Sequence, residues 1–334
     1  MNRKILSIGI FIILCVFTFQ SCKKDRTTVI VQNPTNNTNV SKLNVLGTFT
    51  SAAPALQTFN LVATNGGWIT GVKGCKFYFP ANALLDKNNN PVTGNVTIEL
   101  KEFMNKADML FSGVTVTSGN QLLESGGMFY IMAKQNGEEL HLKNNVGFQM
   151  MVPQADNGNN PMDFWNGVAN DSSLNKVDWE KVDSVVIEKV KDSAQGGGGG
   201  ARQSYFGYFD YFKFGYCNID REAWKFSTII NKFRIKLPNG CKDSNSTALL
   251  LFKNYNCCAW CNWITAEDMM STGYQLPLGE TLKVLVYKKT GSGEDDLAYA
   301  VLEITLVDNT LADFSSVPLI PCTNQQLEDV IKAL

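Results

Sequence analysis

The sequence predicts a mainly β protein made of two antiparallel β-sandwich modules followed by a short C-terminal helix. Two observations carry this prediction. Short runs of alternating apolar and polar residues recur along the chain, and clusters of Gly, Asn and Pro separate them. The chain has 334 residues, 44% of them hydrophobic, so it is long enough for about two domains with buried cores.

The clearest strand pair lies in residues 71–102. Apolar and polar side chains alternate along Cys75–Phe79, and Pro80, which has no N–H to donate to a neighbouring strand, ends that run. The polar stretch 86–91 is typical of a turn, and the alternation resumes along Val96–Leu100. We therefore expect a strand, a short turn of helix, a tight polar loop and a second strand.

The rest of the first module, residues 45–155, follows the same pattern. An apolar run at 127–133 leads to Asn136–Gly137, a dipeptide that favours a two-residue hairpin turn. Further strands are expected at 139–143 and 146–152. Strands of this length and regularity indicate an antiparallel sandwich.

Four short segments stand out in this module, namely Gly67–Ile69, Phe79–Leu84, Asn90–Val96 and Ser125–Phe129. Together they resemble a ZU5-like module found in Bacteroidetes-type outer-membrane lipoproteins of undefined function, and the resemblance covers about residues 65–155. It implies a β-rich protein-interaction module and not an enzyme. The partner is left open by the resemblance.

Residues 156–216 are less regular and predict a connecting region between the two modules. Two strands of a hairpin are expected at 162–167 and 177–180, and a further strand at 182–190. Five consecutive glycines, Gly196–Gly200, cannot hold a regular element and indicate a flexible linker.

Residues 217–321 predict a second sandwich of about seven strands, which resembles immunoglobulin-like or carboxypeptidase-regulatory-like domains. Apolar and polar residues alternate along 233–237, and 248–252 is a continuous apolar run typical of a buried strand. The segments 282–287 and 297–307 flank a polar loop, as the strands of a hairpin do.

The C-terminal segment 322–334 predicts a short amphipathic helix. Leu327, Val330, Ile331 and Leu334 follow one another at intervals of three, one and three residues. This spacing places all of them on one apolar face.

The N-terminus has the pattern of a bacterial lipoprotein signal. Two basic residues precede the apolar run Ile5–Phe19, which is short for a membrane-spanning helix, and the small Ser21 stands directly before Cys22. This segment resembles a lipobox, which implies that residues 1–21 are removed and that Cys22 carries lipid. Several acyl chains anchor a protein stably to a membrane. The alternatives are a stop-transfer anchor or an ordinary secretory signal.

Residues 22–44 predict a flexible tether, because they are rich in Asn and Thr and show no helical periodicity. Lys23–Asp25 partly resembles the signals that send such lipoproteins to the outer face of the outer membrane, although Arg26 stands where a second acid is expected. We expect a lipid-anchored protein of the outer membrane, displayed on the cell surface, with the periplasmic face as the alternative.

Charge and motifs argue against several functions. Without the predicted signal the chain has 28 basic and 31 acidic residues, which does not suit nucleic-acid binding. The only histidine is His141, and the sequence has no nucleophile elbow, zinc-binding helix or phosphate-binding glycine loop. We therefore expect neither an enzyme nor a bound cofactor.

The cysteines could form disulfides or bind a metal ion. Once Cys15 leaves with the signal and Cys22 takes lipid, seven cysteines remain in an exported chain, where one to three disulfides and an odd thiol are expected. The alternative is a four-thiolate zinc site. It would use the following residues: Cys241, Cys257, Cys258 and Cys261.

The loop Asp86-x-Asn88-x-Asn90 has the oxygen spacing of a calcium loop, but Pro91 stands where the calcium loop needs glycine. The sequence also has no acidic residue at the twelfth position, which is Thr97. We expect a hairpin tip.

The segment 205–216 holds eight aromatic residues in twelve positions. Exposed aromatic side chains stack on sugars and anchor partner proteins, so Tyr205, Tyr208 and Tyr211 are the predicted ligand-binding residues. The alternative is that they cover the core.

The expected function is non-enzymatic binding or scaffolding with a glycan or protein partner. A polysaccharide-active enzyme or its accessory protein and a purely structural envelope protein are the alternatives.

Overall fold

The computed structural model describes residues 52–334, apart from 115, 120, 157, 159, 172–175, 193–201, 224–229 and 231. The described residues belong to one compact unit. They form a mainly β fold with several antiparallel sheets and a short C-terminal helix, as predicted. The predicted signal peptide 1–21, the lipidated Cys22 and the tether 22–44 lie outside the described residues, and so does the glycine run 196–200.

The first sheet has the strand order β1-β5-β7-β15-β11-β12, with β6 and β8 paired to β7. Every pairing in it is antiparallel. The long β7 supplies the centre, because its two edges pair with β5 and β15. The strands are β1 (Gln57–Val62), β5 (Asn95–Phe103), β6 (Thr117–Ser118), β7 (Gln121–Gln135), β8 (Glu138–Glu139), β11 (Asp163–Asp171), β12 (Lys176–Lys181) and β15 (Gly215–Glu222).

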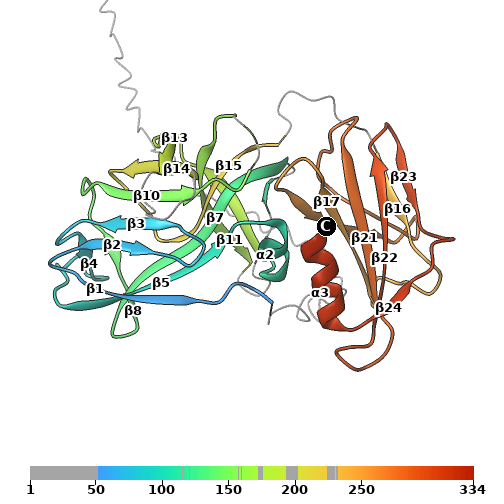
Figure 1. The fold of residues 1–334 in the computed structure, drawn as a ribbon, viewed down its shortest axis with the longest axis horizontal. Helices are drawn as coiled ribbons and strands as arrows, with labels where there is room; N and C mark the ends of the chain where they lie inside the picture. The colour runs from blue at the N-terminus through green and yellow to red at the C-terminus, as the bar shows by residue number, and fades with distance from the viewer. Residues whose placement is uncertain are drawn as a thin grey trace, which may run out of the picture. The chain divides into compact units, whose positions relative to one another are not determined.

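The second sheet has the order β13-β14-β10-β3-β2 and is also antiparallel throughout. Figure 1 shows β14, β10, β3 and β2 lying one beneath the other in this order. A two-stranded pair, β4 with β9, stands apart from it. The strands are β2 (Gly67–Thr70), β3 (Lys76–Phe79), β4 (Leu84–Leu85), β9 (His141–Leu142), β10 (Phe148–Pro153), β13 (Ile187–Asp192) and β14 (Arg202–Phe209).

These two sheets share one core. Phe77 of the second sheet and Phe129 of the first sheet have ring centroids 4.8 Å apart, so the inner faces of the two sheets meet. Phe148 and Phe209, both fully buried or nearly so, continue the aromatic packing. The alternation read along Cys75–Phe79 and Val96–Leu100 is confirmed, because the apolar members of both runs lie in this core.

The region expected to connect the modules is part of the first pair of sheets. β11, β12 and β15 pair into the first sheet, while β13 and β14 pair into the second. The pairing of β15 with β7 therefore assigns Gly215–Glu222 to the first sheet, although the sequence suggested that residue 217 opens the second module. These strands return to the sheets from far along the chain, and local patterning carries no signal for such pairings. The domain boundaries themselves stay predictions.

The second half of the chain holds two further sheets. A five-stranded sheet has the order β18-β17-β21-β22-β24, and a four-stranded sheet has the order β19-β20-β16-β23. Only β16 and β23 among their described pairings run parallel. The strands are β16 (Phe233–Lys236), β17 (Ser246–Phe252), β18 (Cys258–Trp260), β19 (Asn262–Ile264), β20 (Met269–Ser271), β21 (Thr281–Lys289), β22 (Leu297–Thr305), β23 (Thr310–Asp313) and β24 (Ile320–Cys322).

Two described helices accompany the sheets. The predicted C-terminal helix is confirmed as α3 (Asn324–Ala333), which begins with a capping box formed by Thr323 and Gln326. The short α2 (Lys106–Phe111) was not predicted; the side chain of Asn105 caps it. No helix among the described residues is long and apolar enough to span a membrane.

The two halves are joined by hydrogen bonds and by a common core. The backbone N–H of Ser125 donates to the carbonyl of Asn256 at 3.1 Å, and the side chain of Asn256 donates back to the carbonyl of Ser125 at 3.0 Å. Lys106 on α2 donates to the carbonyl of Phe252 at 2.7 Å. Apolar residues of α2, β12, β17 and α3 belong to one buried cluster.

Candidate functional site

The outward face of the five-stranded second sheet carries a line of aromatic side chains. Trp68 on β2 pairs with Tyr78 on β3, Tyr78 pairs with Gln149 on β10, and Gln149 pairs with Tyr208 on β14. These four residues, called the aromatic row below, therefore cross four neighbouring strands in register. Paired residues of adjacent antiparallel strands project from the same face.

A second line lies two residues further along each strand. Thr70 pairs with Lys76, Lys76 with Met151, Met151 with Phe206, and Phe206 with Glu188 on β13. Because side chains two residues apart in a strand share a face, this flanking row borders the aromatic row. Its five members combine two apolar side chains with a hydroxyl, an ammonium and a carboxylate group.

Strict alternation along the strands directs these side chains away from the core. The residues between them, Ile69, Phe77, Met150 and Gly207, are all buried. The burial of one face fixes the register, because a slip by one residue would expose the buried set.

The aromatic row is open to solvent at both ends. Trp68 is 50% exposed and Tyr208 is 52% exposed, whereas Tyr78 and Gln149 between them are partly exposed. The rings of Trp68 and Tyr78 have centroids 5.3 Å apart and are tilted by 45°. Large exposed aromatic side chains gathered on one sheet face are typical of an interaction surface.

The hydroxyl end of Tyr208 lies against the loop that precedes β10. Gly147 in that loop has φ +70°, and a Cβ atom there would stand 2.5 Å from the Tyr208 hydroxyl oxygen. Only glycine combines this backbone conformation with so close an approach. The hydroxyl end of Tyr208 therefore packs closely against this loop.

The three tyrosines predicted to bind a ligand have different positions. Tyr208 belongs to the aromatic row, and Tyr211 is 63% exposed but lies beyond the end of β14, outside both rows. Tyr205 is fully buried, so its predicted role as a surface contact is wrong. It lies an odd number of residues from Tyr208, and alternation turns it into the core. Trp68 and Tyr78, which sequence reasoning missed as ligand-binding candidates, take the other aromatic positions.

Tyr205 instead anchors a buried polar cluster. Its hydroxyl donates a hydrogen bond to the carboxylate of Asp156, and burial together with this carboxylate raises the pKa of Tyr205. The ammonium of Lys189 lies 5.3 Å from the centre of the Tyr205 ring. Gly126 leaves room for the ring, because a Cβ atom there would stand 2.6 Å from it.

Two further carboxylates are buried beside this tyrosine. Glu124 is paired with Arg221, yet burial raises its pKa in spite of the guanidinium. Asp220 accepts a hydrogen bond of 2.5 Å from the side-chain amide of Asn218, and complete burial raises the pKa of Asp220 well above its usual range. Both acids are nearly or fully inaccessible, so they do not form an open catalytic pair.

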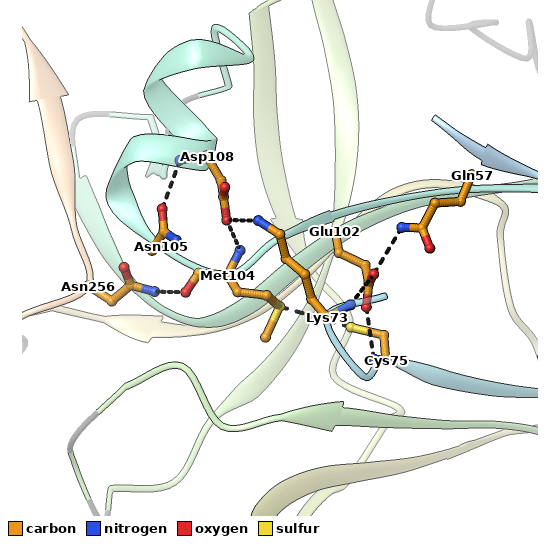
Figure 2. Close-up of polar contacts among 8 residues, drawn as sticks. All are labelled: Gln57, Lys73, Cys75, Glu102, Met104, Asn105, Asp108 and Asn256. Atoms are coloured by element: carbon orange, nitrogen blue, oxygen red, sulfur yellow. Dashed lines mark hydrogen bonds and ion pairs between the residues drawn. The ribbon is translucent and has the colours of Figure 1, made fainter. Parts of the chain in front are cut away.

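A fourth buried carboxylate organises the loop that leads into β3 (Figure 2). Glu102 on β5 is fully buried and accepts hydrogen bonds from the backbone N–H groups of Lys73 and Cys75, each at 2.8 Å, and from the side chain of Gln57 at 2.9 Å. Gly71 must be glycine, since a Cβ atom there would stand 2.4 Å from the Glu102 carboxylate. Glu102 thereby fixes the start of the strand that carries Tyr78.

The same loop is tied to α2. The Lys73 ammonium lies 2.5 Å from the Asp108 carboxylate, which also accepts the backbone N–H of Met104 at 2.8 Å. Asn105 accepts the backbone N–H of Asp108 at 2.9 Å and so starts the helix. These contacts connect the loop before β3 to α2. Their role is structural.

None of the seven described cysteines forms a disulfide, so the expected bridges are not present among them. No three His, Cys, Asp or Glu side chains in the described part of the chain come together as a metal site would require, and the zinc alternative is not supported there. Cys257, Cys258 and Cys261 are buried, while Cys241 is partly exposed. Burial raises the pKa of Cys257, and it raises that of Cys258 to about 12.

The loop with calcium-like spacing is a tight turn closed by a bridge between Leu85 and Pro91. The expected hairpin between the strands at 75–79 and 96–100 is wrong, because β3 and β5 lie in different sheets and do not pair. The Asp86 carboxylate accepts the backbone N–H groups of Asn88 and Asn90, each at 2.8 Å, and the hydrogen bonds from Asn90 lower its pKa. Its oxygens are therefore used to cap its own loop. His141 contacts the side chain of Asn89 at 3.0 Å, which ties β9 to this loop.

Comparison of the chain with known protein families, with curated proteins and with solved structures gave no match. The ZU5-like resemblance therefore stays a prediction. The strongest candidate for function is the outward face of the second sheet, because its aromatic side chains are exposed. The buried carboxylates and most of the cysteines described above have little or no contact with solvent.

Proposed function

We propose that this protein is a lipid-anchored, non-enzymatic binding module of the cell envelope, and that the aromatic row is its binding surface. The observation that carries the proposal is the exposed line of Trp68, Tyr78 and Tyr208 across adjacent strands. Aromatic side chains bury a large area at little conformational cost, and they dominate the energetics of many interfaces.

The supporting sheet is built as a rigid platform. Buried aromatic side chains fill its inner face, and the Glu102 carboxylate secures the loop before β3. A binding surface on packed strands keeps its geometry better than one on loops, and less entropy is lost when a ligand binds.

The anchor is proposed from the sequence. The apolar run Ile5–Phe19 and the Ser21–Cys22 junction support lipidation of Cys22. Residues 22–44 would then hold the folded part away from the lipid. Changing Cys22→Ala should move the protein from the membrane pellet to a soluble fraction, whereas continued membrane association would refute the lipid anchor.

Binding through the sheet face can be tested separately from the anchor. A photoreactive phenylalanine analogue placed at Tyr208 should form covalent adducts when cells carrying the protein are illuminated. The same analogue at Ile320, which is similarly exposed on β24, serves as the matched control. Equal adduct formation at both positions, or none at Tyr208, would contradict the assignment of the binding surface.

A further inference from the structure

We propose that the outward face of the second sheet binds an uncharged polysaccharide chain that lies across β2, β3, β10 and β14. This inference rests on the proposed function and names the class of ligand. The rings of Trp68, Tyr78 and Tyr208 stack on the C–H faces of successive sugar units. The polar members of the two rows bond the sugar hydroxyl groups.

The geometry of the aromatic row suits an extended chain. Adjacent strands lie about 4.8 Å apart, so Tyr208, two strands from Tyr78, stands about 10 Å from it along the row. Trp68 and Tyr78 are closer, with ring centroids 5.3 Å apart. A ligand that touches all three rings must therefore extend over several strands and present an apolar surface along its length.

The polar side chains of the two rows lie beside the aromatic rings, where the hydroxyl groups of a bound polysaccharide would pass. The amide of Gln149 stands between Tyr78 and Tyr208, and the flanking row adds the hydroxyl of Thr70 and the ammonium of Lys76. All three side chains reach solvent at least in part. Sugars combine an apolar ring face with hydroxyl groups around the rim, which matches this alternation of rings and hydrogen-bonding groups.

Charge favours an uncharged polymer. The two rows contain one cation, Lys76, and one anion, Glu188, both in the flanking row. Their charges cancel, so neither an anionic nor a cationic chain gains a net electrostatic attraction from the face. Neutral hydroxyl groups accept from the ammonium and donate to the carboxylate equally well.

A protein partner fits the same face less well. The energetic centre of a protein interface is dry and apolar, and its polar atoms need partners of matching geometry. Here Gln149 occupies the middle of the aromatic row and Lys76 lies beside Tyr78. A chain of hydroxyl-bearing units offers these groups partners at every position.

The test uses the full chain, purified in a polyoxyethylene detergent because an alkyl glycoside would itself offer a sugar. Native gels containing dextran, yeast mannan, laminarin, galactomannan or the anionic polymer alginate measure retardation of the protein. We expect at least one neutral polymer to retard it and alginate to have no greater effect. Trp68→Ala and Tyr208→Ala should each weaken retardation about tenfold, as loss of one aromatic contact implies.

Two variants control for folding and position. Trp68→Phe keeps an aromatic ring and should retain most of the affinity. Tyr211→Ala removes a more exposed tyrosine outside both rows and should leave retardation unchanged. Retardation by alginate alone, or retardation that Trp68→Ala and Tyr208→Ala leave intact, would overturn the inference.

The photoreactive analogue at position 208 separates this inference from the proposed function. Adducts to a protein, together with no retardation by any neutral polymer, would refute the polysaccharide and retain the binding face. The absence of both adducts and retardation would refute the two proposals together.

Discussion

The carboxylate of Glu102 accepts a hydrogen bond of 2.8 Å from the backbone N–H of Cys75, next to the neighbouring sheet. Glu102 lies on β5 of the first sheet, and Cys75 immediately precedes β3 of the second. A single fully buried side chain therefore links the two layers of the sandwich where the strand carrying Tyr78 begins.

We predict that Glu102→Ala destabilises the fold by about 3 kcal/mol or more, because the buried N–H group of Cys75, the partly buried N–H group of Lys73 and the amide of Gln57 lose their acceptor. Chemical unfolding measures the change. The matched control is Glu138→Ala, which removes an exposed carboxylate paired with Lys87 and should change the free energy of unfolding by less than about 1 kcal/mol. Equal effects of the two substitutions would contradict the proposed role of Glu102.

The burial of Asp220 should make the free energy of unfolding depend on pH. Its pKa is raised in the folded state by burial, so with rising pH the unfolded chain ionises first and the folded protein keeps its proton. The contribution of Asp220 to the free energy of unfolding therefore falls above the unfolded pKa of about 3.9, by about 1.4 kcal/mol per pH unit until the folded pKa is reached.

Asp220→Asn removes this titration while it keeps the size of the side chain. We expect the free energy of unfolding of the variant, relative to the wild type, to increase between pH 4 and pH 7 in urea titrations. Asp183→Asn, at an aspartate whose side chain is 90% exposed, should show no such trend. A difference for Asp220→Asn that stays constant with pH would show that Asp220 is ionised in the folded protein.

Gly126 should tolerate no side chain, because a Cβ atom would stand 2.6 Å from the ring of Tyr205. We predict that Gly126→Ala displaces Tyr205 from Asp156 and destabilises the protein by about 1–3 kcal/mol. Gly273→Ala is the control, since nothing lies within 4 Å of the added atom. Thermal unfolding that is equally affected by both changes would refute the steric explanation.

The buried thiols should react slowly. The thiolate is the reactive form of cysteine, and burial raises the pKa of Cys217 and Cys257 and that of Cys258 to about 12. At pH 8 we expect iodoacetamide to modify Cys241 first in the native protein, and all seven described cysteines after unfolding without reductant. Intact mass would reveal a disulfide as two unmodified cysteines in the unfolded sample.

Much of the fold could be predicted from local patterns. The strands around Cys75–Phe79 and Val96–Leu100, the turn at Asn136–Gly137 and the helix α3 all follow from periodicity and turn chemistry. The short α2 could not, because six residues with one capping asparagine carry little signal without the core that they cover.

The proposed binding face was harder to predict than the fold. Alternation alone separates Tyr205 from Tyr208, since an odd spacing in a strand places them on opposite faces. The partnership of Tyr208 with Tyr78 and Trp68 depends on β10 lying between β14 and β3, which joins segments far apart in the chain. Such register comes from the shared core and not from the sequence around each residue.

Hydroxyl-radical footprinting of the full chain, free and bound to cell-envelope fragments, tests the binding face most directly. Trp, Tyr and Met side chains all react with the radical, so both rows are reported in one experiment. We predict that Trp68, Met151 and Tyr208 become protected on binding, while Tyr211 keeps its oxidation rate. Unchanged oxidation of Trp68 and Tyr208 in the bound protein would contradict the assignment of this face.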